Sequence, residues 1–170
     1  NSIGYIETSP LKKIITGNYF TGTVIRAATF KDGERSSPIY TKSYFVHALG
    51  RKRYDGIDVV SIVTDNKNLF DVDTGIYVQG DSVGFANILA NYFKRGKAWE
   101  RNAHVTFFDL EGDVGFEQNV GIRMHGGKGR KNPQKSIRIC ANSAYGAPAI
   151  NYPLFEMREH SVFKTVVLRN

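Results

Sequence analysis

The stretch that decides the fold is GIRMHGGKGRKNPQKSIRI, residues 121–139. It predicts one strand, a glycine-rich basic loop over 126–134, and a return strand that starts at Lys135. Glycines leave backbone N–H groups open to a close-approaching anion, and nearby Arg or Lys side chains supply the compensating charge. The pattern matches neither the Walker A motif nor the dinucleotide fingerprint. Glycine-rich basic turns that bind nothing are common, so the local pattern leaves phosphate binding open.

The whole chain predicts a mainly β fold, α+β at most. Tyr, Phe, Val, Ile and Thr dominate, in short runs bounded by Gly, Asp and Asn, which is typical of strands joined by tight turns. Turns are expected at 31–34 and 110–113, a one-turn helix at 69–70, and an irregular or helical segment over 81–95. We expect strands over residues 23–30, 39–46, 58–64, 103–109, 114–118, 120–125, 135–141 and 163–168.

Composition narrows the class of function. The formal charge is +7, but the basic residues are spread in short runs, which does not favour nucleic-acid binding. No apolar run is long enough to span a membrane. The single cysteine, Cys140, excludes an internal disulfide and is expected to be a small buried residue. The absence of an initiating Met and the strand-like run at 167–170 favour an excised piece of a longer protein.

Several blocks, in their order and spacing, resemble the spore coat protein H (CotH) kinase family. They are residues 59–65, 68–71, 74–78, 95–101, 107–109, 121–127, 133–136, 152–155 and 163–170. Residues 5–46 resemble the last strands of an Ig-like β domain of the chitobiase C-terminal type. The resemblance implies strands of an Ig-like domain over 1–47, a linker over 48–57, and the N-terminal part of a CotH-type kinase domain over 58–170.

The family phosphorylates Ser or Thr of coat proteins with ATP and a divalent metal, Mg or Mn, on an atypical protein-kinase-like fold. The resemblance therefore implies a nucleotide-facing, β-rich lobe in a bacterial spore coat, secreted or cell-surface protein. Lys135 would pair with the nucleotide phosphates, Arg130 would be a second phosphate contact, and Gly126 and Gly127 would complete the cofactor site. Where the family often carries Ala-Ser-Arg, this chain has Lys128-Gly-Arg130.

The catalytic and metal-binding acids of such a kinase are expected beyond Asn170, so no catalytic or metal residue is assigned within this chain. Whether the longer protein is an active enzyme stays open, and this chain alone is expected to be inert and to hold no nucleotide tightly. The alternative function is a non-enzymatic surface or carbohydrate-adhesion module. A weaker third possibility is an accessory domain of a glycan-degrading protein.

Individual residues also carry simpler interpretations. Lys135 could be an exposed strand lysine, and Arg123 and Arg138 are by default partners in internal ion pairs. Trp99 is expected to anchor its loop against the sheet. The four histidines lack zinc spacing. An oxygen-rich loop could bind calcium, although such residues more often hydrogen-bond the backbone of turns; it comprises Asp65, Asn68, Asp71 and Asp73.

Overall fold

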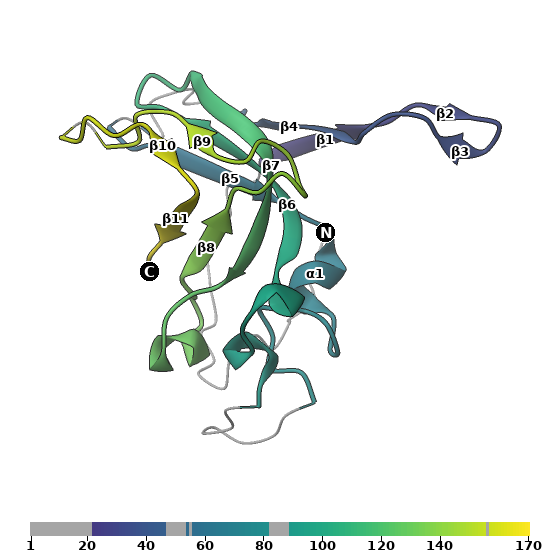
Figure 1. Cartoon of the computed structure of the whole chain (residues 1–170), viewed down its shortest axis with the longest axis vertical. Helices are drawn as coiled ribbons and strands as arrows, with labels where there is room; N and C mark the ends of the chain where they lie inside the picture. Colours follow the sequence, from purple (N-terminus) through teal and green to yellow (C-terminus); the bar gives the residue numbers. More distant parts are fainter. Residues whose placement is uncertain (1–21, 47–53, 55, 82–88, 156) are drawn as a thin grey trace. The chain divides into compact units, whose positions relative to one another are not determined.

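The computed structural model describes residues 22–46, 54, 56–81, 89–155 and 157–170. Strands dominate these residues, which confirms the mainly β prediction (Figure 1). The strands are β1 Thr23–Ala27, β2 Phe30–Lys31, β3 Glu34–Arg35, β4 Tyr40–Tyr44, β5 Val59–Val63, β6 Arg101–Phe108, β7 Val114–Met124, β8 Ile137–Cys140, β9 Ile150–Asn151, β10 Val162–Phe163 and β11 Thr165–Leu168. The helices are α1 Asn66–Phe70 and the 3-10 helices η2 Asn91–Phe93, η3 Lys97–Trp99 and η4 Lys128–Lys131.

A five-stranded sheet has the strand order β11-β8-β7-β6-β5. Strand β8 runs antiparallel to both β7 and β11, so side chains of three neighbouring strands share each face. One face buries Val120, Ile122 and Ile139, each no more than 2% exposed. Burial of aliphatic side chains on one face fixes the register, because a slip of one residue would move them all to the other face.

The chain divides into two compact units. The first comprises Thr64–Ala103 and Asn119–Asn170, and it contains the glycine-rich loop with its two flanking strands. The second comprises His104–Gln118 together with described residues up to Val63. Every contact of the candidate site discussed below lies within the first unit.

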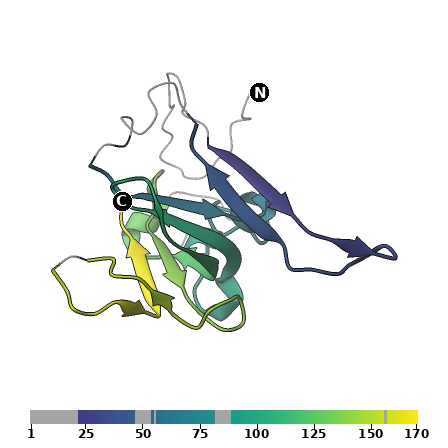
Figure 2. The ribbon, with the colours of Figure 1, turned by 90° about the horizontal axis from the view of Figure 1, so that it is seen from above.

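The second unit carries a two-stranded ribbon formed by β1 and β4, with β2 and β3 at its tip (Figures 1 and 2). The tip is the Asp-Gly turn expected from the sequence. Asp32 and Gly33 have φ values of 51° and 83°, the left-handed conformation that a type I′ hairpin requires at both central residues.

Several boundaries differ from the sequence prediction. The strands expected at 114–118 and 120–125 form one continuous strand, β7, because Asn119 stays in the extended conformation. Strand β8 begins at Ile137 instead of Lys135, whose backbone N–H donates to the Tyr77 hydroxyl rather than to β7. The strand expected at 163–168 divides into β10 and β11 at Lys164. The helix expected at 69–70 begins earlier, at Asn66.

Some predictions concern residues outside the described ranges. Most of the linker over 48–57 and residues 82–88 of the segment over 81–95 lie there, so the domain boundaries stay predictions. Of the apolar residues in that segment, Leu89 is 67% exposed and Tyr92 is 1% exposed, and η2 supplies the helical turn around Tyr92.

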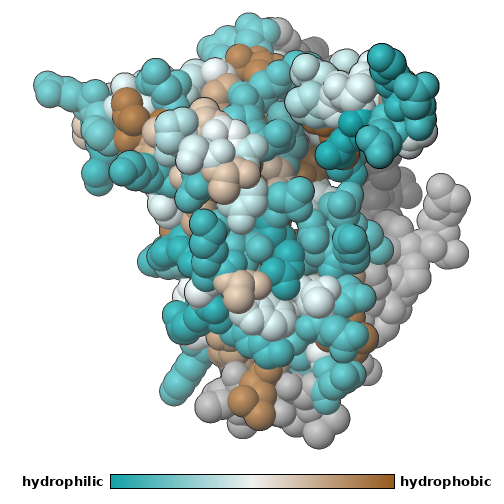
Figure 3. All heavy atoms as spheres, turned by 45° about the vertical axis from the view of Figure 1, so that its right-hand side comes forward, coloured by the Kyte–Doolittle hydropathy of each residue, from teal (hydrophilic) through white to brown (hydrophobic). Residues whose placement is uncertain are grey.

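The face drawn in Figure 3 is mostly hydrophilic, with apolar atoms in separate small areas. Scattered apolar atoms of this kind are normal for a protein surface in water. None of the helices in the described ranges has the length and apolar character needed to span a lipid bilayer.

Candidate functional site

The glycine turn between β7 and β8 has open space beside its backbone. Gly126 has a φ of 105°, in the region that favours glycine. A Cβ atom built on Gly126 or Gly127 would meet no heavy atom within 4 Å. Both glycines identified from the sequence therefore leave room for a close-approaching ligand, which is what an anion-binding turn requires.

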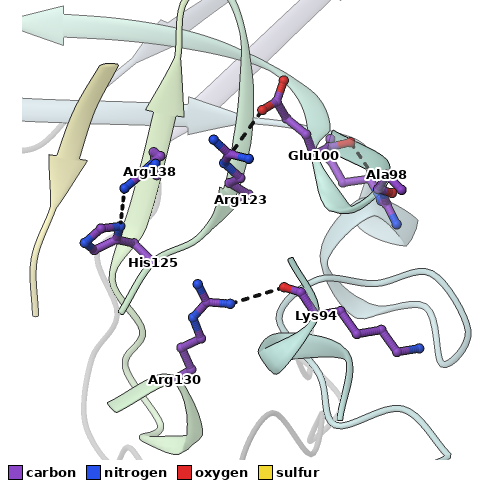
Figure 4. A network of polar contacts seen from close by, with 8 residues as sticks. Lys94, Ala98, Glu100, Arg123, His125, Arg130 and Arg138 are labelled. Atoms are coloured by element: carbon purple, nitrogen blue, oxygen red, sulfur yellow. Dashed lines mark hydrogen bonds and ion pairs between the residues drawn. The ribbon is translucent and has the colours of Figure 1, made fainter. Parts of the chain in front are cut away.

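Arg130 lies in η4 and is only 4% exposed. Its Nε donates to the carbonyl of Gly126 at 2.8 Å. Its Nη1 donates to the carbonyl of Lys94 at 3.1 Å, with longer contacts to the carbonyls of Phe93 and Tyr92 (Figure 4). Burial lowers the pKa of this guanidinium, with contributions from neighbouring arginines. Arg130 thus fastens the glycine turn to the segment after η2, and the described residues offer no acceptor to its Nη2.

Lys135 lies two residues before β8, and its side chain is directed into the protein. The residue is 4% exposed, so the interpretation as an exposed strand lysine is wrong. Its Nζ donates to the carbonyl of Asn132 at 2.7 Å and lies 4.9 Å and 4.7 Å from the ring centroids of Tyr77 and Tyr92. Burial lowers the pKa of this ammonium from 10.5 to about 8.

Tyr77 holds the backbone that carries Lys135. Its hydroxyl donates to the carbonyl of Pro133 at 2.9 Å and accepts from the backbone N–H of Lys135 at 3.2 Å. Burial raises the pKa of Tyr77, so the hydroxyl keeps its proton. Sequence reasoning missed Tyr77 and Tyr92 as parts of the site, because nothing in their local patterns indicates which lysine they meet.

An arginine cluster adjoins the glycine turn, and its members contribute to each other's electrostatic environment. We define it as Arg95, Arg123, Arg130, Arg138 and Arg169. Arg123 on β7 and Arg138 on β8 are directly opposite in the antiparallel register. His125 accepts a hydrogen bond through Nδ1 from Nη2 of Arg138 at 3.1 Å (Figure 4). Burial lowers the pKa of His125, and the arginines lower it further, which favours the neutral imidazole that this bond needs.

Glu100 is the carboxylate nearest to this cluster in the described part of the chain. Its Oε2 lies 3.8 Å from Nε of Arg123, and its side chain is 7% exposed. The expected internal ion pair is therefore confirmed for Arg123. Arg138 instead donates a hydrogen bond to His125. Gly121 makes room for Glu100, since a Cβ there would lie 2.5 Å from Oε1.

A scan against protein-family models and searches of curated proteins and solved structures find no match to the chain. The chemistry of these side chains therefore carries the functional assignment.

Other residues singled out from the sequence have structural roles. Asp71 accepts hydrogen bonds from the backbone of Asp73 and from the backbone and hydroxyl of Thr74, which confirms the turn interpretation of that carboxylate. The Thr74 hydroxyl bond is the largest cause that lowers the pKa of Asp71. Cys140 is buried, as expected. Within the described ranges, no three His, Cys, Asp or Glu residues gather as metal ligands would.

Trp99 is a half-buried ring that contacts two cations. The Nζ of Lys94 lies 4.3 Å from the ring centroid, and the guanidinium carbon of Arg101 lies 5.2 Å from it. Arg101 also donates to the carbonyl of Thr74 through Nε and Nη2. These contacts join the segment around η3 to Arg101, the first residue of β6, which agrees with the expected anchoring role.

Proposed function

We propose that this chain is the nucleotide-facing, β-rich portion of a CotH-like Ser/Thr protein kinase from a bacterial spore coat, secreted or surface protein. The observation that carries the proposal is the buried ammonium of Lys135, two residues before β8, at the end of the loop that begins with the open glycine turn. An ammonium out of water attracts phosphate oxygens more strongly than an exposed one, because the surrounding dielectric constant is lower. The ligand class, ATP phosphates, is the one that the family resemblance implies.

The side chains of the candidate site suit binding of nucleotide phosphates better than binding of a divalent metal. Arg130 and Lys135 supply positive charge, and the glycines supply close approach. The described residues supply no metal site, since they hold no suitable ligand group and Glu100 is already paired with Arg123. The family resemblance implies Mg or Mn and acids that position a Ser or Thr hydroxyl, and we assign neither to the described residues. Phosphoryl transfer depends mainly on positioning and electrostatic stabilisation, and Lys135 would contribute the second.

Substitution of Lys135 tests this proposal. We expect the chain to bind ATP weakly and Lys135→Ala to weaken that binding about tenfold or more, because a charge-assisted hydrogen bond is lost. Lys97→Ala is the matched control, since it removes the same charge from an exposed site in η3. Titration of both variants by calorimetry or phosphorus NMR gives the dissociation constants. Equal affinities of the Lys135 variant and the unsubstituted chain would refute the role.

The second test uses the pKa of Lys135. An ammonium attracts phosphate only while it is protonated, so this part of the affinity is present below pH 8 and is lost as the pH rises through about 8. The phosphate groups are already ionised there, because their second pKa is about 6. ATP affinity should therefore fall between pH 7 and pH 9.5. The Lys135→Ala variant should show a much flatter profile, and identical profiles would contradict the assignment.

One observation favours the adhesion alternative. The β1–β4 ribbon exposes large side chains, with Ile25 at 55%, Tyr40 at 66% and Tyr44 at 47%. The register places all three on the same face of the ribbon. Exposed tyrosine rings can stack on a sugar or on a protein surface. Such adhesion does not use Lys135, so a ligand whose binding survives Lys135→Ala would favour this second function.

A further inference from the structure

Two arginines face each other across neighbouring strands on the face of the sheet opposite to the aliphatic core. Arg123 of β7 pairs with Arg138 of β8, while Ile122 and Ile139, on the other face, are buried. Directly opposite side chains have Cβ atoms only about 5 Å apart, and like charges there destabilise a sheet. Val167 of β11 is opposite Arg138, so Arg169, two residues later and just beyond β11, continues the same face.

The neighbouring side chains neutralise little of this charge. Glu100 pairs with Arg123, whereas the partner of Arg138 among the described residues is the imidazole of His125, which supplies an acceptor and no negative charge. The Nε of Arg138 is buried and has no hydrogen-bond partner among the described residues. A buried donor without an acceptor is destabilising, so an arrangement of this kind calls for a missing acceptor.

We propose that Arg123 and Arg138 form a binding site for a doubly charged tetrahedral oxyanion, a phosphate or sulfate group. This site is separate from the ammonium of Lys135, and it does not depend on the proposed kinase function. Each guanidinium is a planar fork whose parallel N–H groups match two oxygens of such an anion. A tetrahedral dianion can meet both forks at once and leaves two oxygens for further donors.

The rest of the cluster suits the same ligand class. Arg130, whose Nη2 has no acceptor among the described residues, lies next to the pair in Figure 4. Arg95 donates through Nη2 to the carbonyl of Gly126 and thereby stays beside the turn. Five arginines with one nearby carboxylate leave a large positive excess within the described residues. A dianion offsets more of that excess than a carboxylate would.

The test compares sodium sulfate with sodium chloride at matched ionic strength, because general screening also relieves repulsion between like charges. We expect sulfate to raise the melting temperature of the unsubstituted chain well above the value in chloride. Arg138→Gln should remove most of this rise and weaken sulfate affinity by about tenfold or more, since a bidentate charged contact is lost. In chloride alone, Arg138→Gln should melt at a higher temperature than the unsubstituted chain, because the repulsion with Arg123 is gone.

Controls separate this site from a general charge effect and from Lys135. Arg35→Gln, on the exposed strand β3, removes the same charge elsewhere and should leave the sulfate effect unchanged. Lys135→Ala should also retain it. If Arg138→Gln does not fold, Arg138→Lys keeps the charge without the fork and should show an intermediate loss. Sulfate affinity that is unchanged in the folded Arg138 variant would overturn the proposal.

Competition identifies where the anion comes from. If ATP displaces sulfate from the unsubstituted chain, the site takes part of the nucleotide's own phosphate tail. If ATP and sulfate bind together, the site takes a separate phosphorylated or sulfated ligand. Both results support the oxyanion site. Whether Lys135→Ala loses ATP binding or keeps it tests the proposed function alone and leaves the oxyanion site untouched.

Discussion

Replacing Arg130 with alanine is expected to lower the free energy of unfolding by about 3 kcal/mol, the range of changes that break a buried hydrogen-bond network. The guanidinium is 4% exposed and donates to the carbonyl of Gly126 and to carbonyls of the segment 92–94. Alanine would leave those acceptors buried without a donor. The glycine turn would lose its main attachment to the segment after η2, so ATP affinity should fall as well.

Chemical denaturation measures this change in the free energy of unfolding. Two further variants serve as comparisons. Lys128→Ala removes an exposed charge from the same helical turn and should change stability by less than about 0.5 kcal/mol. Arg130→Lys keeps the charge, but a single ammonium cannot reach all these carbonyls, so most of the loss should remain. An Arg130→Ala variant as stable as Lys128→Ala would show that the turn does not depend on these bonds.

Gly75→Ala is the second large prediction, with an expected loss of about 3 kcal/mol from steric overlap in a packed region. A Cβ at Gly75 would lie 2.5 Å from the carbonyl oxygen of Asp71, 2.6 Å from its nitrogen and 2.7 Å from the carbonyl oxygen of Leu69. These are backbone atoms at the end of α1, and they cannot move aside without breaking the bond from Gly75 N–H to Asp71.

The steric overlap at Gly75 should also disturb the candidate site around Lys135. Tyr77 follows two residues later, and its hydroxyl bonds to the backbone of Pro133 and Lys135. The matched control is Gly129→Ala in η4, where a Cβ would meet only Nδ2 of Asn132, at the ordinary contact distance of 3.8 Å. Thermal unfolding and ATP titration of the two variants make the comparison. Equal stability of the two variants would mean that the close approach at Gly75 is not maintained in solution.

The strand pattern could be predicted from the sequence because each strand has its own local signal. The Asp-Gly turn at 32–33 and the β-rich runs around it need no long-range information. The division of β10 from β11 at Lys164 could not be predicted, because it depends on pairing with two different partners, β9 and β8. The extent of β7 was missed for a similar reason, since sheet pairing overrides the weak strand preference of Asn119.

Gly126, Gly127, Arg130 and Lys135 were singled out from the glycine-rich basic loop together with the family resemblance. The structure places them in one turn and at its end, and their role in nucleotide binding stays a prediction. Their surroundings were not predictable, because the burial of Lys135 depends on Tyr77 and Tyr92, which are more than 40 residues away in sequence. The opposition of Arg123 and Arg138 depends on the register of β7 and β8, and the length of the intervening loop does not fix that register.

The position of Trp99 gives the chain an internal optical probe. It is the only indole in the sequence, and the amine of Lys94 lies over it, while the carbonyl of the same lysine accepts from Arg130. A ligand that displaces the Arg130 side chain would also move Lys94, whose ammonium lies over the Trp99 ring. The fluorescence emission of Trp99 would therefore change. Events at the glycine turn can therefore be followed by intrinsic fluorescence, without attaching a dye.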